Sequence, residues 1–516
     1  MCGIFFIASK QTIDLDICKI NSLKIKHRGP DNTKHIQLNI EDYFIYTEFH
    51  RLSINGIDEK SNQPINIDGL YLLCNGEIYN YKQLAIDHDI KLTTNSDCEI
   101  ILHLYIKFGY SMIDLLDGVF AFIIIDTNKS NIMIGHDPFG IRPIYIGYDL
   151  DTIIISSELK SIKNIKNLNK IDLYKPGHFS IYDLKQNIQK PIIYNQYYNF
   201  IYHDNKITDE LELTQNIQTK LYNSVYKRLT GDREIGCLLS GGLDSSIITL
   251  ISCQILGPKN VNTFSIGLKD SPDMLAANNV SEYLGTNHTS IEITEKDITD
   301  SIEDTIYQIE SNDVTTIRAS IPMFILSKYI RDNTNIKVIL SGEGSDEASG
   351  SYLYFHNAPN PVDFQEECIR LLKDVYMFDV LRGDKTTAGS GLEIRVPFFD
   401  KEFMNFYMSI NPEYKIIRNG YEKYLLRKTY EEYLPKDIVW RRKEGFSDGV
   451  SKLNKPLYQI IEEHTIKRYK MLEKNYYDYI FNKYYGNYTY IIPYQWLPKW
   501  SGHIDNPSGR LLMSLF

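Results

Sequence analysis

The hydrophobic pattern of the chain changes near residue 200. Before that point, short apolar segments stand between polar ones, a pattern that favours the strands of sheets. The clearest of these segments are residues 3–8, 119–125, 132–134 and 153–155. Residues 195–212 then pass from a Tyr-rich loop sequence into a charged helical pattern, which predicts a domain boundary there. We therefore expect one domain over 2–200 and a second over 210–516.

After residue 210, apolar runs alternate with helical patterns. The runs that predict buried strands are 235–239, 261–268, 288–293 and 337–341. The segments that predict helices are 244–256, 272–284, 297–309 and 319–332. This alternation is typical of an α/β domain with a parallel sheet, whose ligands bind at the carboxyl ends of the strands.

Two small-residue turns follow predicted strands of this second domain, at 240–246 and 341–347. Glycines that let backbone N–H groups approach an anion, hydroxyl groups and a helix N-terminus together predict a phosphate site. The first turn has no lysine, so it is not the G-x-x-x-x-G-K-[ST] loop. Each turn instead holds an aspartate, Asp244 or Asp346, and the pair could share Mg²⁺ on a leaving pyrophosphate. The alternative is a pair of ordinary Gly-rich turns without a ligand.

Composition narrows the class of protein. The 516 residues carry a formal charge of −10, which argues against a nucleic-acid surface. There are 7 cysteines, an odd number, without a C-x-x-C spacing, so neither a disulfide framework nor a zinc site is expected. Neither a signal peptide nor a stretch of about 20 apolar residues is seen. We expect a cytoplasmic protein that associates neither with membranes nor with nucleic acid.

Cys2 follows the initiator methionine directly. If Met1 were removed, Cys2 would carry both a thiol and a free α-amine, and the amine could take the thiol proton without a histidine. A cysteine at the second position can equally be chance. Asn75-Gly76, inside an apolar segment, is either a hairpin turn or a side-chain amide beside a backbone N–H, as an oxyanion hole requires. Arg51 and Asp97 are either surface charges or ligands for the charged groups of an amino acid.

These N-terminal motifs, in this order, resemble the class II glutamine amidotransferases. The matching stretches are 2–4, 27–31, 51–54, 75–80, 96–97, 116–121, 137–143 and 157–160. The resemblance implies an α+β N-terminal-nucleophile hydrolase domain, an αββα sandwich, with Cys2 as nucleophile. It implies Asn75 and Gly76 as oxyanion hole. The residues that it implies for glutamine binding are Arg51, Leu52, Ser53, Ile54, Asn75, Gly76, Glu77 and Asp97. Ser96 is expected to cap the helix that follows it.

The second half resembles the ATP-pyrophosphatase synthetases, and among them the asparagine synthetase family. The matching stretches are 240–246, 271–273, 313–320, 341–347, 352–360, 391–398, 440–450 and 505–510. The resemblance implies that ATP activates aspartate as β-aspartyl-AMP, with Mg²⁺ bound by Asp244 and Asp346. It implies Glu343 as the base for attacking ammonia and Lys443 as a catalytic cation. The ATP and pyrophosphate site is implied for Leu238, Ser240, Gly241, Gly242, Asp244, Ser245, Ile266, Ser341, Gly342 and Lys385, with Arg318 as a further cation.

Two rival interpretations share these folds. A β-lactam-type amide synthetase generally lacks the working cysteine, whereas this chain has Cys2. A catalytically inactive relative would have no need for Cys2, Asp244, Glu343, Asp346 and Lys443. The resemblance further implies a homodimer and a dry passage for ammonia, since protonated ammonia is no nucleophile. Segment 451–500 matches the family least.

Overall fold

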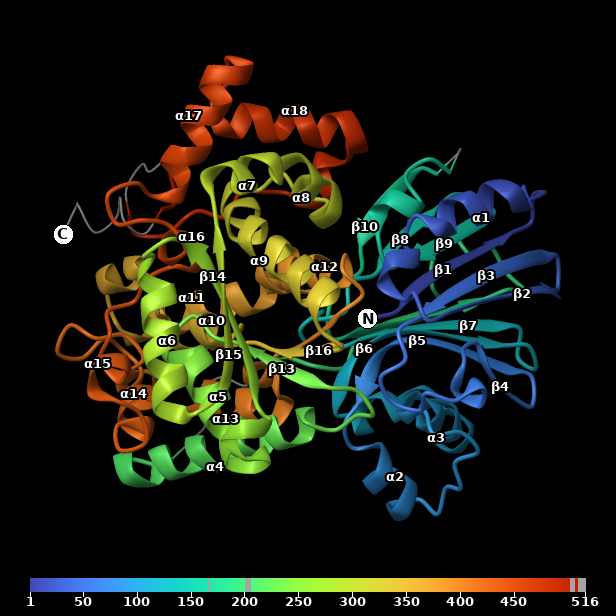
Figure 1. Cartoon of the computed structure of the whole chain (residues 1–516). Coiled ribbons are helices and arrows are strands. Elements are labelled where there is room, and N and C mark those ends of the chain that lie inside the picture. The colour runs from blue at the N-terminus through green and yellow to red at the C-terminus, as the bar shows by residue number, and fades with distance from the viewer. Residues whose placement is uncertain (166–167, 200–205, 502–505, 509–516) are drawn as a thin grey trace. The chain divides into compact units, whose positions relative to one another are not determined.

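The computed structural model describes residues 1–165, 168–199, 206–501 and 506–508, which fold as two compact units (Figure 1). Unit 1 consists of Met1–Asn199, Gly231–Arg233 and Ala388–Glu393. Unit 2 consists of Phe200–Thr230, Glu234–Thr387 and Ile394–Phe516. Of the boundary predicted at 195–212, residues 200–205 lie outside the described residues, as do Asp505, Gly509 and Arg510 of the last matching stretch.

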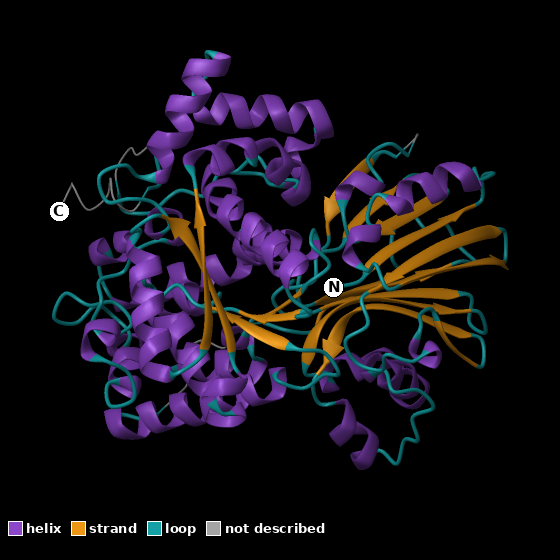
Figure 2. Cartoon of the chain, viewed as in Figure 1, coloured by secondary structure: helices purple, strands orange, loops and turns teal. Residues whose placement is uncertain are grey.

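The described residues of unit 1 form two antiparallel sheets of six strands each (Figure 2). The first has the order β10-β8-β9-β1-β3-β2 and the second the order β12-β11-β7-β6-β5-β4. The strands of the first sheet are β1 (Gly3–Ser9), β2 (Asn32–Ile40), β3 (Tyr43–Arg51), β8 (Tyr145–Tyr148), β9 (Thr152–Ser156) and β10 (Lys170–Leu173). Those of the second are β4 (Ile65–Ile67), β5 (Leu70–Ile78), β6 (Gly118–Asp126), β7 (Asn131–His136), β11 (His178–Asp183) and β12 (Ile193–Gln196).

The central strands of both sheets are covered on both faces. Every residue of β1 is buried, and in β6 only Gly118 is partly exposed. Strands covered on both faces read as continuous apolar runs, as these do. The helices α1 (Leu15–Leu23), α2 (Tyr81–Asp87) and α3 (Ile100–Phe108) lie on the outer faces of the sheets (Figure 2). Unit 1 is therefore the αββα sandwich that the sequence predicted.

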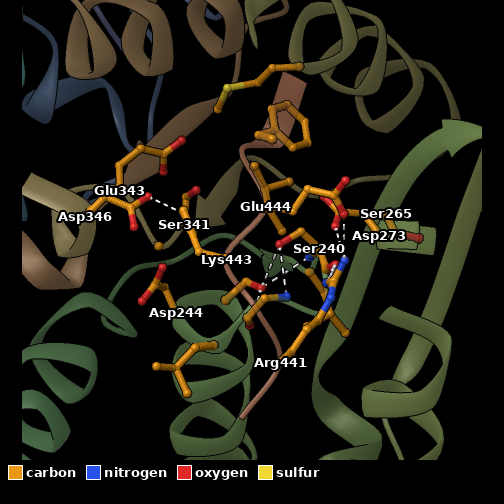
Figure 3. Close-up of a pocket in the computed structure, with 18 of the residues that line it drawn as sticks. Ser240, Asp244, Ser265, Asp273, Ser341, Glu343, Asp346, Arg441, Lys443 and Glu444 are labelled. Atoms are coloured by element: carbon orange, nitrogen blue, oxygen red, sulfur yellow. Dashed lines mark hydrogen bonds and ion pairs between the residues drawn. The ribbon is translucent and has the colours of Figure 1, made fainter. Parts of the chain in front are cut away.

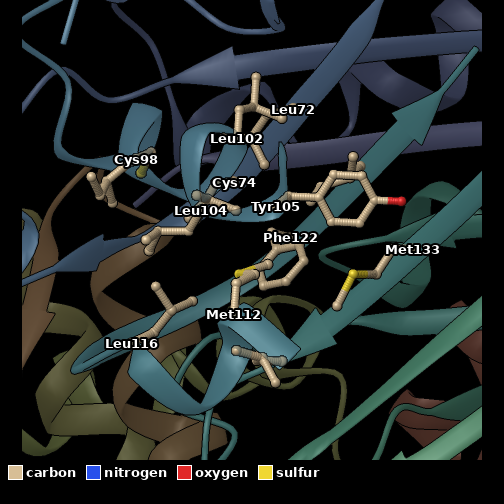
Figure 4. Close-up of a cluster of buried hydrophobic side chains, with 14 of the residues drawn as sticks. Leu72, Cys74, Cys98, Leu102, Leu104, Tyr105, Met112, Leu116, Phe122 and Met133 are labelled. Carbon is tan, nitrogen blue, oxygen red and sulfur yellow. The ribbon is translucent and has the colours of Figure 1, made fainter. Parts of the chain in front are cut away.

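The core between α3 and the second sheet explains why helix and sheet associate. Leu72, Ile100, Leu104 and Phe122 are fully buried there, beside Met112 (Figure 4). Burial of a side chain of this size contributes about 1.5–3 kcal/mol.

Two local expectations in unit 1 have different outcomes. Asn75-Gly76 lies inside β5, paired with Ala121 and Phe120 of β6, and forms no hairpin turn. Ser96 precedes a 3₁₀ turn, Asp97–Glu99, but its side chain makes no capping hydrogen bond, so the predicted cap is wrong. The Glu99 carboxylate instead holds the loop ahead of this turn, since it accepts from the N–H of Thr93 at 2.8 Å and from that of Thr94 at 2.6 Å.

Unit 2 is built on the predicted parallel sheet, with the strand order β15-β14-β13-β16-β17. The strands are β13 (Ile235–Leu238), β14 (Asn262–Leu268), β15 (Asn287–Ile293), β16 (Val338–Leu340) and β17 (Glu393–Arg395). β13 pairs in parallel with both β14 and β16, so the segments that follow these strands share one edge of the sheet. The two small-residue turns lie at this edge, as expected.

Helices surround this sheet (Figures 1 and 2). The first six are α4 (Glu210–Arg228), α5 (Leu243–Leu256), α6 (Pro272–Leu284), α7 (Glu295–Asp300), α8 (Ile302–Ile309) and α9 (Val314–Asn333). The next five are α10 (Ser345–Ser349), α11 (Pro361–Asp374), α12 (Asp379–Ala388), α13 (Lys401–Ser409) and α14 (Tyr424–Tyr430). The last four are α15 (Lys436–Val439), α16 (Phe446–Gly449), α17 (Leu457–Tyr469) and α18 (Glu473–Tyr485). Among the described residues, no helix combines the length and apolar character that crossing a membrane requires.

Candidate active sites

The first candidate site surrounds Cys2, which immediately precedes β1. Eight of the residues predicted for this site line its cavity, namely Cys2, Arg51, Leu52, Ile54, Asn75, Gly76, Glu77 and Asp97. Ser53 is not among the lining residues; its N–H donates to the Asp31 carboxylate at 2.9 Å. Asn55, Gln63 and Glu393 also line the cavity, although sequence motifs gave them no role.

The side-chain amide of Asn75 faces Cys2, and its oxygen and nitrogen have different environments. The backbone N–H of Cys2 donates to Asn75 Oδ1 at 2.8 Å. The amide nitrogen of Asn75 is buried and has no hydrogen-bond partner among the described residues. A buried donor without an acceptor is costly, and such a donor beside a nucleophile suits an oxyanion.

The charged residues of this cavity are held by their neighbours. The guanidinium of Arg51 donates to Asn62 Oδ1 at 2.9 Å and to the carbonyl of Asn55 at 3.0 Å. Asp97 Oδ2 accepts from the N–H of Ile78 at 2.7 Å, at the end of β5. One cationic and one anionic side chain therefore lie at fixed positions on the same cavity wall, which suits the two charged groups of a free amino acid.

A buried ion-pair cluster supports the backbone of Cys2. Arg28 Nε donates to the carbonyl of Cys2 at 2.8 Å, and its Nη1 lies 2.9 Å from Glu158 Oε1. Lys160 Nζ lies 2.5 Å from the other carboxylate oxygen of Glu158. Burial would raise the pKa of Glu158, but Lys160, His27 and Arg28 together hold this pKa well below its ordinary value. Two motifs that sequence reasoning left without a role, at 27–31 and 157–160, thus meet behind the candidate nucleophile.

Whether Met1 is attached decides which groups beside the Cys2 thiol can accept its proton. Burial lowers the pKa of the Met1 α-amine to about 6 and raises the pKa of the Cys2 thiol to about 11. A thiol with so high a pKa is protonated at neutral pH and needs a base beside it. While Met1 is attached, the nitrogen of Cys2 is a peptide N–H and cannot serve as that base.

The second candidate site is a cavity of about 170 Å³ in unit 2, at the carboxyl edge of the sheet (Figure 3). The predicted residues that line it are Leu238, Ser240, Gly242, Asp244, Ser245, Ile266, Ser341, Gly342, Glu343, Asp346 and Lys443. Asp244, Glu343, Asp346 and Lys443 gather on one side of the cavity, whereas Ser240 and Arg441 lie on the other (Figure 3).

Two glycines bring the small-residue turns close to their neighbours. Gly241 has φ +69°, and an added Cβ would lie 2.3 Å from the backbone of Ala276. This explains why Gly241 is required although it does not line the cavity. A Cβ on Gly342 would lie 3.0 Å from Asp244 Cβ, so this glycine allows the two turns to approach each other.

Asp244 and Asp346 share one cation, Lys423. Its ammonium lies 2.6 Å from Asp244 Oδ2 and also contacts Asp346 Oδ1. Lys443 Nζ lies 2.6 Å from Asp346 Oδ2. Burial would raise the pKa of Asp346, but the two lysines hold this pKa well below its ordinary value. Burial would likewise lower the pKa of Lys443, yet Asp346 and Asp244 raise it above its ordinary value.

Glu422 and Arg427 connect the backbones that carry these two lysines. Glu422 Oε1 accepts from the N–H of Lys443 at 3.1 Å and from Arg427 Nη2 at 3.1 Å. Arg427 Nη1 donates to the carbonyl of Arg441 at 2.9 Å. Lys423 itself has φ +59°, a left-handed conformation that is unfavourable for a side chain with a Cβ. Such conformations concentrate at functional sites.

A third group of polar atoms faces the same cavity. Arg382 Nη1 lies 3.5 Å from Glu343 Oε1, and Arg382 Nη2 lies 2.8 Å from Asp379 Oδ1. Arg382 Nε and Glu343 Oε2 are buried without a hydrogen-bond partner among the described residues. An unpaired donor and an unpaired acceptor on one wall suit a ligand that has both kinds of group.

Two cations expected at this site do not line the cavity. Lys385 is fully buried and forms an ion pair with Glu310. Arg318 Nε donates to Glu473 Oε1 at 2.8 Å, and the second carboxylate oxygen binds the same guanidinium. Because a buried cation needs a nearby anion, each is committed to its own carboxylate rather than to the cavity.

Lys423, Arg382 and Arg427 are charged residues of this cavity that sequence reasoning missed. Lys423 lies between Glu422 and Tyr424, without a neighbouring glycine, and Arg382 lies inside α12. A weak signal existed for Lys423, since it is a second lysine 20 positions before Lys443 and precedes a helix. Arg382 resembles any charged residue of an amphipathic helix.

Comparison with known proteins agrees with this division into two sites. Residues 1–218 match the family model of the glutamine amidotransferase domain. Residues 216–366 and 357–495 match that of asparagine synthase. The proteins named asparagine synthetase [glutamine-hydrolyzing] from Rattus norvegicus and Homo sapiens are 38% and 37% identical to this chain. In each case the match covers 99% of this chain and 98% of the relative. The counterpart from Gallus gallus is 37% identical over the same shares.

Proposed function

The chain belongs to the family of glutamine-hydrolysing asparagine synthetases, and from that premise we propose how its two cavities divide the reaction. Unit 1 hydrolyses glutamine at Cys2, and unit 2 uses ATP to activate aspartate, which the released ammonia converts to asparagine. The observation that carries the first assignment is the placement of Asn75, with its oxygen on the Cys2 N–H and its nitrogen free.

Removal of Met1 would create the base for glutamine hydrolysis. The freed α-amine of Cys2 takes the thiol proton, and the thiolate attacks the amide carbon of glutamine. The Asn75 amide nitrogen and the Gly76 N–H stabilise the oxyanion. The protonated α-amine then gives its proton to the leaving nitrogen, and collapse of this intermediate releases ammonia and leaves a thioester. Water hydrolyses the thioester to glutamate and restores the thiol. Arg28 keeps the Cys2 carbonyl in place through its 2.8 Å hydrogen bond.

The opposite charges of the first cavity would position glutamine. We assign the α-carboxylate of the substrate to Arg51 and its α-ammonium to Asp97 and Glu77, since like charges would repel. Leu52, Ser53 and Ile54 form the adjoining segment after β3. Several backbone carbonyls hold Arg51, among them that of Asn55, so its position is set before substrate binds.

Unit 2 would bind ATP along the edge of its sheet. We assign adenosine to Leu238, Ile266 and Gly342, and the pyrophosphate to the turn 240–245. A side-chain carboxylate oxygen of the substrate aspartate attacks the α-phosphorus of ATP, and pyrophosphate leaves. Lys443 and Lys423 lie where cations must offset the charge of two reacting anions. Ser341 lines the same wall, whereas Lys385 is left out of this site because it is paired with Glu310.

The carboxylates of Asp244 and Asp346 fit a magnesium ion. Mg²⁺ is usually bound by one or two carboxylates together with substrate phosphates, and these two side chains reach one cavity from adjacent turns. When bound, the ion neutralises charge on the pyrophosphate leaving group. The close approach of Gly342 to Asp244 keeps the two turns within reach of a shared ligand.

The remaining polar atoms suit aspartate and ammonia. We assign the α-carboxylate of aspartate to Arg382, which lines the cavity and whose Nε is unpaired. Glu343 takes the proton that ammonia loses when it attacks the activated carbonyl, and the bond from this carbonyl to AMP breaks as AMP leaves. We further propose that the protein is cytoplasmic and a homodimer; all 7 cysteines are free thiols, as expected in a reducing compartment.

Replacement of the nucleophile separates the two activities. Cys2→Ala should lower glutamine-dependent asparagine synthesis by about 10³-fold or more, because a deleted nucleophile typically has this effect. Synthesis from ammonia should stay within about 2-fold of wild type, since the second cavity is untouched. The measurement is asparagine formed with ATP, Mg²⁺, aspartate and either nitrogen source. Cys18→Ala, a buried thiol that does not line the cavity, is the matched control. Loss of both activities in Cys2→Ala would contradict the assignment.

A further inference from the structure

Every oxygen of the Asp244 and Asp346 carboxylates accepts a hydrogen bond. Asp244 Oδ1 accepts from Ser345 Oγ at 2.7 Å, and Asp244 Oδ2 from Lys423 at 2.6 Å. Asp346 Oδ1 accepts from Lys423 and from Ser351 Oγ, and Asp346 Oδ2 from Lys443 at 2.6 Å. Of these donors, Lys423 alone serves both carboxylates. A cation that bridges both aspartates would therefore take the position that the Lys423 ammonium now holds between them, since two cations repel each other at so short a range.

We propose that Lys423 and the divalent metal are alternative occupants of the position between Asp244 and Asp346. The metal then binds well only together with the nucleotide, whose phosphates receive the displaced ammonium. This inference rests on the proposed function, because it assumes the metal site at these two aspartates. It adds a role for Lys423: this residue makes metal binding depend on ATP.

The backbone of Lys423 is fixed, and its side chain lines the cavity. Its φ of +59° and the neighbouring hydrogen bonds of Glu422 with Arg427 and the Lys443 N–H hold the main chain. The side chain is a flexible four-carbon stem that carries a compact charge. Lys423 lines the same cavity as Ser240 and Ser245 of the pyrophosphate turn. The ammonium can thus exchange carboxylate oxygens for phosphate oxygens without movement of the fold.

Charge explains the direction of the expected effect. With Lys423 in place, Asp244 and Asp346 are already compensated, and a metal must displace a favourable contact on each. Without Lys423, the two carboxylates share a site in which Lys443, beside Asp346, is the remaining ion-pair partner among the described residues, and like charges at close range attract a cation strongly. The free protein should consequently bind metal more tightly when the lysine is neutralised.

Direct metal titration of the full chain tests this proposal. The probe is Mn²⁺, followed by the paramagnetic resonance of the free ion, first alone and then with a non-hydrolysable ATP analogue. Wild type should bind Mn²⁺ weakly alone and at least 10-fold more tightly with the analogue. Lys423→Met, which keeps the length of the side chain without its charge, should bind Mn²⁺ alone at least 10-fold more tightly than wild type. Lys428→Met, at a lysine 46% exposed on α14, is the matched control and should behave as wild type.

Two further variants guard the interpretation. Lys423→Arg keeps a cation that can contact both aspartates, so it should bind Mn²⁺ alone as weakly as wild type. Lys423→Gln repeats the neutral substitution with a polar side chain, in case the methionine variant does not fold. Unchanged glutamine hydrolysis in unit 1 and unchanged tryptophan fluorescence in unit 2 show that each protein is folded.

The outcomes separate this inference from the function on which it rests. Equal affinity of wild type and both neutral variants for Mn²⁺ alone overturns the role of Lys423 and leaves the metal site standing. Absence of saturable Mn²⁺ binding in every variant, with or without the analogue, overturns the metal site of Asp244 and Asp346 as well. The site is distinguished from other metal-binding positions by Asp346→Asn, which should abolish the binding gained in Lys423→Met.

Discussion

At the scale of single residues, Lys415 is buried in unit 2, and no carboxylate of the described residues pairs with its ammonium. Its side chain is 1% exposed, and its ammonium contacts the Tyr407 carbonyl at 3.4 Å and Met408 Sδ at 3.9 Å. Burial lowers the pKa of Lys415 to about 8. The charged form is therefore disfavoured in the folded protein relative to the unfolded chain.

Lys415→Met should stabilise unit 2 at neutral pH. The pKa of this lysine is about 8 when folded and 10.5 ordinarily, so the folded state binds its proton less tightly than the unfolded state does. The resulting destabilisation is fully present below pH 8 and is relieved as the pH rises to about 10.5. The variant should gain up to about 3 kcal/mol at pH 7, and this gain should shrink by about 1.4 kcal/mol per pH unit above pH 8.

Urea unfolding followed by tryptophan fluorescence measures this effect, because Trp440, Trp496 and Trp500 all belong to unit 2. Lys428→Met, at an exposed lysine, serves as control and should change the free energy of unfolding by less than about 0.5 kcal/mol. A gain that is the same at pH 7 and pH 10 would show that the buried charge is not its cause.

Residue identity was predictable where local sequence defines the environment. Asp244, Glu343 and Asp346 lie in glycine-rich turns after apolar strands, and each reaches the cavity as expected. Lys423 and Arg382 reach it from a helix cap and from inside a helix, so only tertiary packing places them. Charge balance alone predicts that cations are needed at this site, but it does not predict which lysines supply them.

At the scale of elements, the segment that carries Lys443 has little regular structure of its own. It runs between the short helices α15 and α16 and is held by hydrogen bonds to its backbone. Glu422 accepts from the Lys443 N–H and Arg427 donates to the Arg441 carbonyl, while just after α16 the Val450 carbonyl accepts from the Leu268 N–H at 2.8 Å. Its shape is imposed by α14 and β14 rather than by local propensity.

Glu422→Ala should therefore impair the second site through Lys443. We expect the rate of asparagine synthesis from ammonia to fall by about 10- to 100-fold, since small misplacements of a catalytic group have effects of this size. Glutamine hydrolysis should stay unchanged. Glu422→Gln retains an acceptor oxygen and should recover part of the rate, which a general loss of stability would not predict.

A double-mutant cycle gives the decisive measurement. If Glu422 acts by positioning Lys443, then Glu422→Ala should add little to the loss caused by Lys443→Ala. Glu432→Ala, at an exposed carboxylate near the end of α14, is the control and should leave the rate within about 2-fold. Fully additive losses in the cycle would assign Glu422 a role independent of Lys443.

The regular strands and helices were easier to predict from the sequence than the conformation of this segment. The apolar runs predicted at 235–239 and 288–293 are β13 and β15, and the helix predicted at 272–284 is α6. The helix expected over 297–309 is divided into α7 and α8 at Ser301, which ends the first and begins the second. Periodicity identifies buried faces, whereas breaks depend on contacts with distant residues.

At the scale of the whole molecule, the two units carry chemistry with different requirements. The proposed hydrolysis at Cys2 would use a thiol, an amine and amide groups, whereas the cavity in unit 2 places two aspartates beside the turn proposed to bind pyrophosphate. Chelation of divalent metal should therefore abolish pyrophosphate release, because the charge of the leaving group is no longer offset. Glutaminase activity should persist within about 2-fold.

Pyrophosphate and glutamate assays on one EDTA-treated sample make the comparison internal. Excess Mg²⁺ should restore pyrophosphate release, which excludes irreversible damage. Pyrophosphate release that is insensitive to EDTA would contradict the metal site at Asp244 and Asp346.

The two folds and the order of the motifs were predictable from sequence because each class of motif belongs to one architecture. The unit to which each short stretch belongs was not predictable, since this depends on packing across long separations in the chain.

That interleaving has a consequence for dissecting the protein. Unit 1 includes Ala388–Glu393, which the chain supplies after most of unit 2 has been made, and Glu393 lines the cavity of Cys2. A fragment that stops at residue 199 would omit this stretch, and a single protease cut near residue 200 would leave it on the other piece. An autonomous glutaminase would have to be assembled by splicing both 231–233 and 388–393 back onto the N-terminal portion. During synthesis on the ribosome, the wall of the first active site is likewise completed only after residue 393 has emerged.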